Sequence, residues 1–184
     1  MANLMPYDEL NILRQYFTAY QNANKRVDET DAEDEILDLL ILAYMRGIQS
    51  ASDTLGIDIV ADAEQMRESV YKRIADKDFV QRAREAAEKG DIADLQKIAE
   101  TDAHRVYGQA IVNAAKASGL PCNKVWITMA DSRVRDTHEP LDHMVVDIND
   151  DFYTWDNDHA PSPGLFEKAS NNVNCRCVIE IEPK

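Results

Sequence analysis

Basic residues are scarce in this 184-residue sequence, which has 20 Lys and Arg against 34 Asp and Glu and therefore a formal net charge of −14. Phosphate backbones are bound by clustered Lys and Arg, so this balance argues against a general grip on DNA or RNA. It also argues against an anionic membrane surface. With 45% hydrophobic residues, the chain is too apolar for a disordered acidic tail. Its length predicts one or at most two small domains.

Long apolar runs are also missing. The longest, residues 36–45, is interrupted by Asp38, and it is shorter than the roughly 20 residues that a membrane-spanning helix needs. The first residues, MANLMPYDE, carry acidic groups where a secretory signal has a basic segment and then an apolar stretch. The cysteines, Cys122, Cys175 and Cys177, are an odd number without framework spacing, which fits reduced thiols. We therefore expect no membrane span, no signal peptide and a cytosolic product.

Glycine and proline are rare before residue 120, and apolar residues recur there at three- and four-residue steps, so we predict a helical region over residues 1–120. Helices are expected over residues 6–20, 30–56, 61–89 with a break at 76–78, and 92–118. The second begins with the capping-box pattern TDAE and can be capped by a following glycine. It is apolar on more than one side, which favours a central position or a partner.

After residue 120 the hydrophobic period changes from 3.6 to 2. Strands are predicted over residues 124–129, 144–148 and 175–181, and a long loop over about 149–174. A loop of that size is usually functional or mobile. The expected strand-and-loop region, residues 121–184, would complete one α+β domain. In that domain an N-terminal helical bundle packs on a small, mostly antiparallel C-terminal sheet.

Two arginines, Arg133 and Arg135, follow the first predicted strand, and His138 comes three residues after the second. If the strand continues, the arginines share one face and can clamp a carboxylate or a phosphate. We favour the alternative, in which they brace the fold through a buried ion pair with a helix acid such as Glu100. Glu100 and His104 lie four residues apart on one helix face, so they are also a candidate general acid–base pair.

The final predicted strand begins with two cysteines, and alternation places Cys175 and Cys177 on its inward face. We interpret them as small buried hydrophobic residues. The alternatives are a zinc site that joins them to His138 and His143, and a nucleophilic cysteine with His138 as its base. In the Cys-x-Cys pattern one residue separates the cysteines, whereas about two to four residues usually separate such a pair in zinc sites. A disulfide between residues i and i+2 of a strand is near the outer limit of permitted separation.

Aspartates gather at the end of the second predicted strand and in the loop that follows it, at Asp147, Asp150, Asp151, Asp156 and Asp158. Clustered carboxylates are what a calcium site requires, but the spacing of an EF-hand and its closing Glu are missing. A solvated acidic loop is the interpretation that we favour.

An ordered set of short segments also carries a family resemblance. These segments are IAETDA (98–103), YGQA (107–110), KVW (124–126), DSRVRDTH (131–138), LD (141–142), Phe152 and VNCRC (173–177). In this order they resemble the phage Mu F-like head morphogenesis family, the minor head proteins of tailed bacteriophages. The resemblance covers about residues 90–182.

The resemblance implies a non-enzymatic virion protein, present in few copies, that associates with phage portal and capsid proteins. It would be made in the bacterial cytoplasm, packaged inside the head, and assist assembly or genome delivery without a cofactor. We expect a structural polar cluster of Glu100, Arg133, Arg135, His138 and Asn174 to lock the long loop and the last strand onto the helices.

The competing hypothesis is a metal-dependent or cysteine-dependent enzyme centred on His138, Cys175 and Cys177. Members of the family can also carry a toxin domain after this module. Since seven residues follow Cys177, we expect no such domain here.

Overall fold

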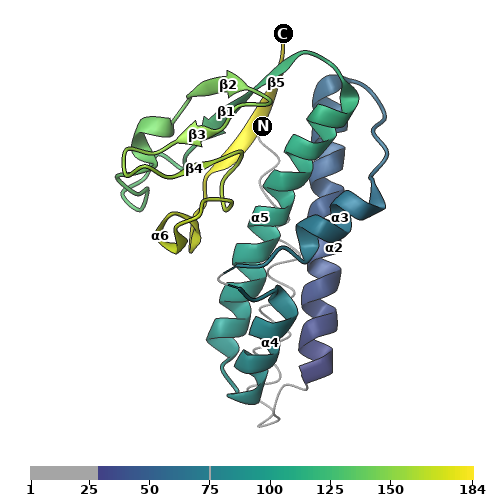
Figure 1. Cartoon of the computed structure of the whole chain (residues 1–184), viewed down its shortest axis with the longest axis vertical. Coiled ribbons are helices and arrows are strands. Elements are labelled where there is room, and N and C mark those ends of the chain that lie inside the picture. Colours follow the sequence, from purple (N-terminus) through teal and green to yellow (C-terminus); the bar gives the residue numbers. More distant parts are fainter. Residues whose placement is uncertain (1–28, 75) are drawn as a thin grey trace.

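The computed structural model describes residues 29–74 and 76–184 of the chain (Figure 1). The helix expected over residues 6–20 lies outside the described residues. Within them, the long helices precede the sheet, and the sheet is small and antiparallel, which confirms the predicted α+β fold. In the described ranges, no helix has the length and apolar character needed to cross a membrane.

The four helices that the structure describes between residues 29 and 118 form the elongated part of the molecule (Figure 1). They are α2 (Glu29–Leu55), α3 (Ala63–Val70), α4 (Phe79–Glu88) and α5 (Ile92–Ser118). The long helices α2 and α5 lie side by side, and the short α3 and α4 pack against both. This arrangement follows from the two broad apolar faces of α2 and α5, which are buried against each other and against the shorter helices.

The helix ends lie where local signals predict them. Gly56 and Gly119 follow α2 and α5 with φ of 67° and 66°, a left-handed conformation that glycine adopts without strain. The Asp91 side chain accepts a hydrogen bond of 2.9 Å from the backbone N–H three residues later, and so caps α5. The break expected at residues 76–78 is wider than predicted and extends from the end of α3 to the start of α4.

Close contact between α2 and α5 depends on Gly47. A Cβ atom at this position would lie 2.6 Å from the Tyr107 carbonyl oxygen and 2.6 Å from the Ala110 Cβ. No side chain fits at that separation, so glycine allows the two backbones to approach each other.

The main sheet has three strands in the order β2-β1-β5, and both pairs are antiparallel. They are β1 (Cys122–Ile127), β2 (Val145–Asp147) and β5 (Val178–Pro183). The sheet reaches the helices through β5, which contacts α2 and α5. The strand predicted from residue 175 begins only at Val178, so the prediction that Cys175 and Cys177 open it is wrong. Both cysteines belong to an irregular segment that precedes β5.

The predicted long loop contains secondary structure of its own. It carries a two-stranded hairpin of β3 (Phe152–Tyr153) and β4 (His159–Ala160), followed by the short helix α6 (Ala169–Asn172). Aromatic side chains from the loop pack on the central strand of the main sheet. The Trp126 ring centroid lies 5.1 Å from that of Phe152 and 5.7 Å from that of Phe166. The loop is therefore held over the sheet by an aromatic core.

Candidate functional site

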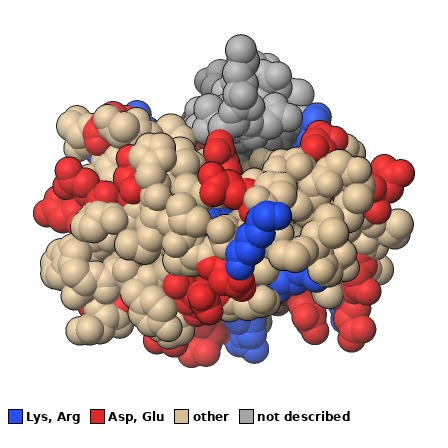
Figure 2. Space-filling view, turned by 90° about the horizontal axis from the view of Figure 1, so that it is seen from above, with Lys and Arg blue, Asp and Glu red and all other residues tan. Residues whose placement is uncertain are grey.

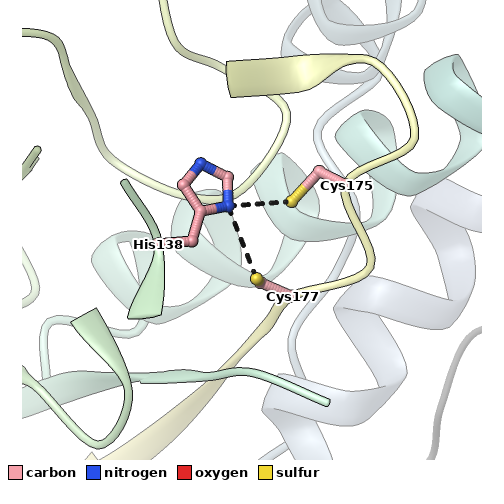
Figure 3. Close-up of side chains that lie close together, drawn as sticks. All are labelled: His138, Cys175 and Cys177. Carbon is pink, nitrogen blue, oxygen red and sulfur yellow. Dashed lines mark hydrogen bonds between the residues drawn. The ribbon is translucent and has the colours of Figure 1, made fainter. Parts of the chain in front are cut away.

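One imidazole and two thiols meet beneath the long loop. The His138 Nδ1 atom lies 3.6 Å from the Cys175 Sγ atom and 3.6 Å from the Cys177 Sγ atom (Figure 3). All three candidate ligand atoms lie within 4.8 Å of one another. Among the residues that the structure describes, this is the one group of three or more His, Cys, Asp or Glu side chains close enough to hold a metal ion.

Local backbone geometry brings these side chains together. His138 lies at the start of a 3-10 turn, Glu139–Leu141, in the connection between β1 and β2. Asn174 has φ of 58°, a left-handed conformation that asparagine tolerates better than most residues. The Cys175 N–H then donates a hydrogen bond to the Asn172 carbonyl oxygen. This turn, and not the alternation of a strand, directs both thiols at the imidazole.

The group is almost completely enclosed. His138 is 1% exposed, Cys177 4% and Cys175 8%. The imidazole stacks on Phe166 and meets the edge of Trp126, with ring centroids 5.3 Å apart in both pairs. Its Nε2 atom points away from the sulfurs (Figure 3) and has no hydrogen-bond partner among the described residues. The three ligand side chains therefore have little contact with solvent.

The two thiols differ in their readiness to ionise. The pKa of Cys175 lies well below its usual value because Cys177 donates a hydrogen bond to its sulfur and because His138 favours the thiolate. The pKa of Cys177 is raised, first by that same hydrogen bond and then by burial. One thiolate and one thiol side by side are a pair from which a cation could displace the remaining proton.

Most of the predicted polar cluster surrounds one cavity beside the cysteines. The cavity has a volume of about 430 Å³ and is lined by Glu100, Thr101, Arg133, Arg135, Asn174, Cys175 and Arg176. A second cavity, of about 10 Å³, borders His138, Asn174 and Cys177. The structure therefore brings all five cluster residues into one neighbourhood. The locking role assigned to them stays a prediction.

The two predicted arginines are arranged differently from a clamp. β1 ends at Ile127, so Arg133 and Arg135 lie in a turn and not on a continued strand. The Arg133 side chain is 74% exposed, with its Nη2 atom 3.5 Å from Asp131. Arg135 is half-buried and donates a hydrogen bond to the Val173 carbonyl oxygen.

Arg176 is a residue at this site that the sequence analysis did not single out. Its two terminal nitrogens donate hydrogen bonds of 2.9 Å and 2.6 Å to the two carboxylate oxygens of Asp131. The pKa of Asp131 is lowered to about 2, mainly by this hydrogen bonding. The bidentate pair ties the turn after β1 to the segment between the two cysteines.

His104, one member of the candidate acid–base pair, forms a hydrogen bond to the backbone of the segment before β5. Its Nε2–H donates a hydrogen bond of 2.6 Å to the Cys177 carbonyl oxygen, and the side chain is 8% exposed. His143, the fourth candidate metal ligand, lies outside the group of three. Its side chain is 77% exposed and its Nε2 atom lies 3.7 Å from Asp142.

The acidic loop residues do not converge on a shared cation position in the described part of the chain. Asp147 pairs with Lys184 at 2.6 Å, and Asp156 with Lys168 at 3.1 Å. Asp158 differs from the solvated residue that we expected, because it is only 2% exposed.

The Asp158 carboxylate organises the loop from within. It accepts hydrogen bonds from the backbone N–H groups of His159, Glu167 and Lys168 and from the Asn171 side-chain amide, at 2.9 to 3.1 Å. Four donors on one buried carboxylate join β4 to the start of α6.

Sequence reasoning also missed a buried charged pair on α5. Arg105 is 1% exposed, and its Nη2 atom lies 3.0 Å from the Asp102 carboxylate. Its Nη1–H donates a hydrogen bond of 2.6 Å to the Ser69 carbonyl oxygen at the end of α3, and Arg82 of α4 approaches Asp102 at 2.7 Å. Asp102 lies on the same helix face as the apolar residues Leu95 and Ala99, and this interruption of the stripe is a signal that could have indicated a buried charge.

The outer surface carries acidic side chains. Figure 2 shows Asp and Glu distributed among uncharged residues on the face seen from above. This distribution accords with the net charge of −14.

Comparison with known proteins identifies a family and two relatives that this chain resembles in sequence. The chain matches the family described as Phage Mu protein F like protein over residues 61–180. It is 38% identical over 89 residues to NAD(+)--arginine ADP-ribosyltransferase EFV of Enterococcus faecalis, a match that covers 46% of this chain and 18% of that protein. It is 27% identical over 90 residues to Minor head protein GP7 of Bacillus phage SPP1, which covers 48% of this chain and 29% of that protein.

The chain thus spans less than a third of either relative. No solved structure matches it. The family match runs from the segment before α3 to the middle of β5, so it includes α5, β1 and the whole His138–Cys175–Cys177 group. It covers well over half of the sequence, and the chain therefore belongs to the Phage Mu protein F like family.

Proposed function

We propose that this chain is a minor head protein that acts in bacteriophage head morphogenesis. The observation that carries the proposal is the family match over residues 61–180, together with the likeness to a protein named Minor head protein GP7. In this role the chain is made in the bacterial cytoplasm, associates with the portal and the capsid proteins, and is packaged inside the head in few copies.

A non-enzymatic role fits the chemistry of the enclosed groups. His138, Cys175 and Cys177 are each less than a tenth exposed, and the Nε2–H of His104 is already used by a backbone carbonyl. These side chains hold the loop, the sheet and α5 together, so the module offers partners a fixed surface. No cofactor is required for such a role.

The likeness to an ADP-ribosyltransferase supports the same proposal. Only 18% of that protein is matched, and the resemblance to the head morphogenesis family implies that members can carry a toxin domain after the head module. We therefore propose that the segment shared with the transferase is the head module and that its enzymatic activity belongs to another part of that protein.

Co-purification with the portal tests the partner assignment. The full chain would be co-expressed with the portal protein encoded in the same phage or prophage, and the mixture separated by size-exclusion chromatography. The expected result is co-elution with the portal oligomer, while a portal from an unrelated phage elutes alone. Separate elution from its own portal would contradict the proposed association.

A further inference from the structure

We propose that His138, Cys175 and Cys177 bind one structural zinc ion, with a water molecule as the fourth ligand. This inference does not depend on the role in head assembly. It rests on the residue types, on the distances between their ligand atoms and on their enclosure.

The distances fit tetrahedral zinc. Bonds of about 2.3 Å to sulfur and about 2.05 Å to nitrogen, at a tetrahedral angle, place the N and S ligands about 3.6 Å apart. The Nδ1 atom of His138 lies 3.6 Å from each sulfur. Two tetrahedral thiolates are about 3.8 Å apart. Since the three ligand atoms already lie within 4.8 Å of one another, the sulfurs need to approach by about 1 Å at most.

The charges also fit. Two thiolates neutralise a divalent cation, and an imidazole with two thiolates is a ligand set that favours zinc over magnesium or calcium. The buried Trp126 indole N–H has no hydrogen-bond partner within the described ranges, and it lies near the Cys177 sulfur. Such an N–H group beside a metal-bound sulfur is a supporting contact that stabilises its negative charge.

Three protein ligands leave one tetrahedral position open. The cavity of about 10 Å³ that borders His138 and Cys177 has room for about one water molecule. Because the three ligand residues are at most 8% exposed, we assign the ion a structural role. It would join the turn before η1 (Glu139–Leu141) to the segment before β5, and thus fix the end of the long loop to the sheet.

Metal content of the full chain, purified without a histidine tag from zinc-containing medium under reducing conditions, tests the proposal. We expect about one equivalent of zinc per chain by elemental analysis. After removal of the metal, titration with Co²⁺ is expected to give the visible absorption of a tetrahedral site and a sulfur-to-cobalt band, both saturating near one equivalent. Less than a tenth of an equivalent of zinc, together with no saturable cobalt spectrum, would overturn the proposal.

Matched variants locate the ligands. The double variant Cys175→Ser, Cys177→Ser and the single variant His138→Asn are expected to lose the zinc and the cobalt spectrum. Cys122→Ser, which alters a buried thiol elsewhere in the sheet, and His143→Asn, which alters an exposed imidazole, are expected to keep both. Retention of stoichiometric zinc by the double cysteine variant would overturn the assignment. If that variant does not fold, the metal content of the unaltered chain still decides.

Discussion

The Nε2–H of His104 donates a 2.6 Å hydrogen bond to the carbonyl oxygen of Cys177, 73 residues later in the chain. This contact ties the middle of α5 to the irregular segment that leads into β5. Together with the Arg176–Asp131 pair, it holds that segment from two sides, against the helices and against the turn after β1. The sheet is therefore attached to the helices at the same place where the two thiols are directed inward.

Replacement of His104 by leucine is expected to lower the free energy of unfolding by about 1–3 kcal/mol, because the enclosed Cys177 carbonyl loses its donor. Urea denaturation of both proteins would measure the loss. The control is His143→Leu, whose imidazole is 77% exposed and whose replacement is expected to change stability by less than about 0.5 kcal/mol. Equal stability of the His104 variant and the unaltered chain would contradict the attachment role.

Replacement of Asp158 by asparagine is expected to loosen the loop. The carboxylate accepts four hydrogen bonds, whereas the amide has one acceptor oxygen and would set its NH₂ group against other N–H donors. We expect a loss of about 2–3 kcal/mol and faster hydrogen exchange over residues 158–172. The exposed Asp150→Asn variant is the control. Unchanged exchange in this segment would show that Asp158 does not organise the loop.

Replacement of Arg105 by methionine is expected to cost about 3–5 kcal/mol, because it removes one of the two arginines that pair with the buried Asp102 carboxylate and leaves the Ser69 carbonyl without its donor. The matched control is Arg84→Met, which removes the pair with Glu33. That arginine side chain is 51% exposed, and the expected cost is below about 1 kcal/mol. Thermal and urea unfolding would compare the two variants, and similar losses for both would contradict the special role of the buried pair.

The buried side chain of Lys124 is expected to make the free energy of unfolding depend on pH. Its side chain is fully buried, and its Nζ–H donates a hydrogen bond of 2.8 Å to the Pro161 carbonyl oxygen. Burial, with repulsion from Lys116, lowers the pKa of Lys124 to about 8. The unfolded chain keeps a pKa of about 10.4, so between these values it binds more protons than the folded chain, and the contribution of Lys124 to stability rises with pH.

The difference in unfolding free energy between the unaltered chain and Lys124→Met isolates this effect. We expect the difference to shift in favour of the unaltered chain by up to about 3 kcal/mol between pH 8 and 10.4. Urea denaturation at several pH values in that window would measure it. The same difference at every pH would show that the lysine does not titrate abnormally.

Local signals in the sequence were sufficient to predict where the helices end, but not where the last strand begins. Gly56, Gly119 and Asp91 each act on the turn in which they lie, so their neighbours alone determine the helix boundary. The segment at Cys175 alternates like a strand, yet it has no strand partner before Val178, since β1 pairs with β5 only from that residue onward. Pairing is decided by distant residues, which a local pattern does not contain.

The candidate site was predicted in composition more completely than in geometry. The sequence favoured buried, hydrophobic cysteines and offered a metal or thiol centre with His138 as the alternative, and the structure brings His138, Cys175 and Cys177 together in a buried group. His143 was predicted as a fourth metal ligand for its residue type alone. Its side chain is exposed because the backbone turns at this residue, with φ of 57°, and no local sequence signal predicts that turn. The buried carboxylate of Asp158 was not predicted from the sequence, because its hydrogen-bond donors come from the loop itself. The fold of that loop is set by packing on Trp126 and other aromatic side chains.

The central claim, that this module is a packaged component of the phage head, is tested most directly by quantitative mass spectrometry of purified particles. Particles would be isolated from a host that carries the intact phage, treated with protease, and then opened. The claim requires a few copies of the chain per particle, protected from protease until the heads are opened. Absence of the chain from particles, while it is present in the lysate of the same cells, would contradict the claim.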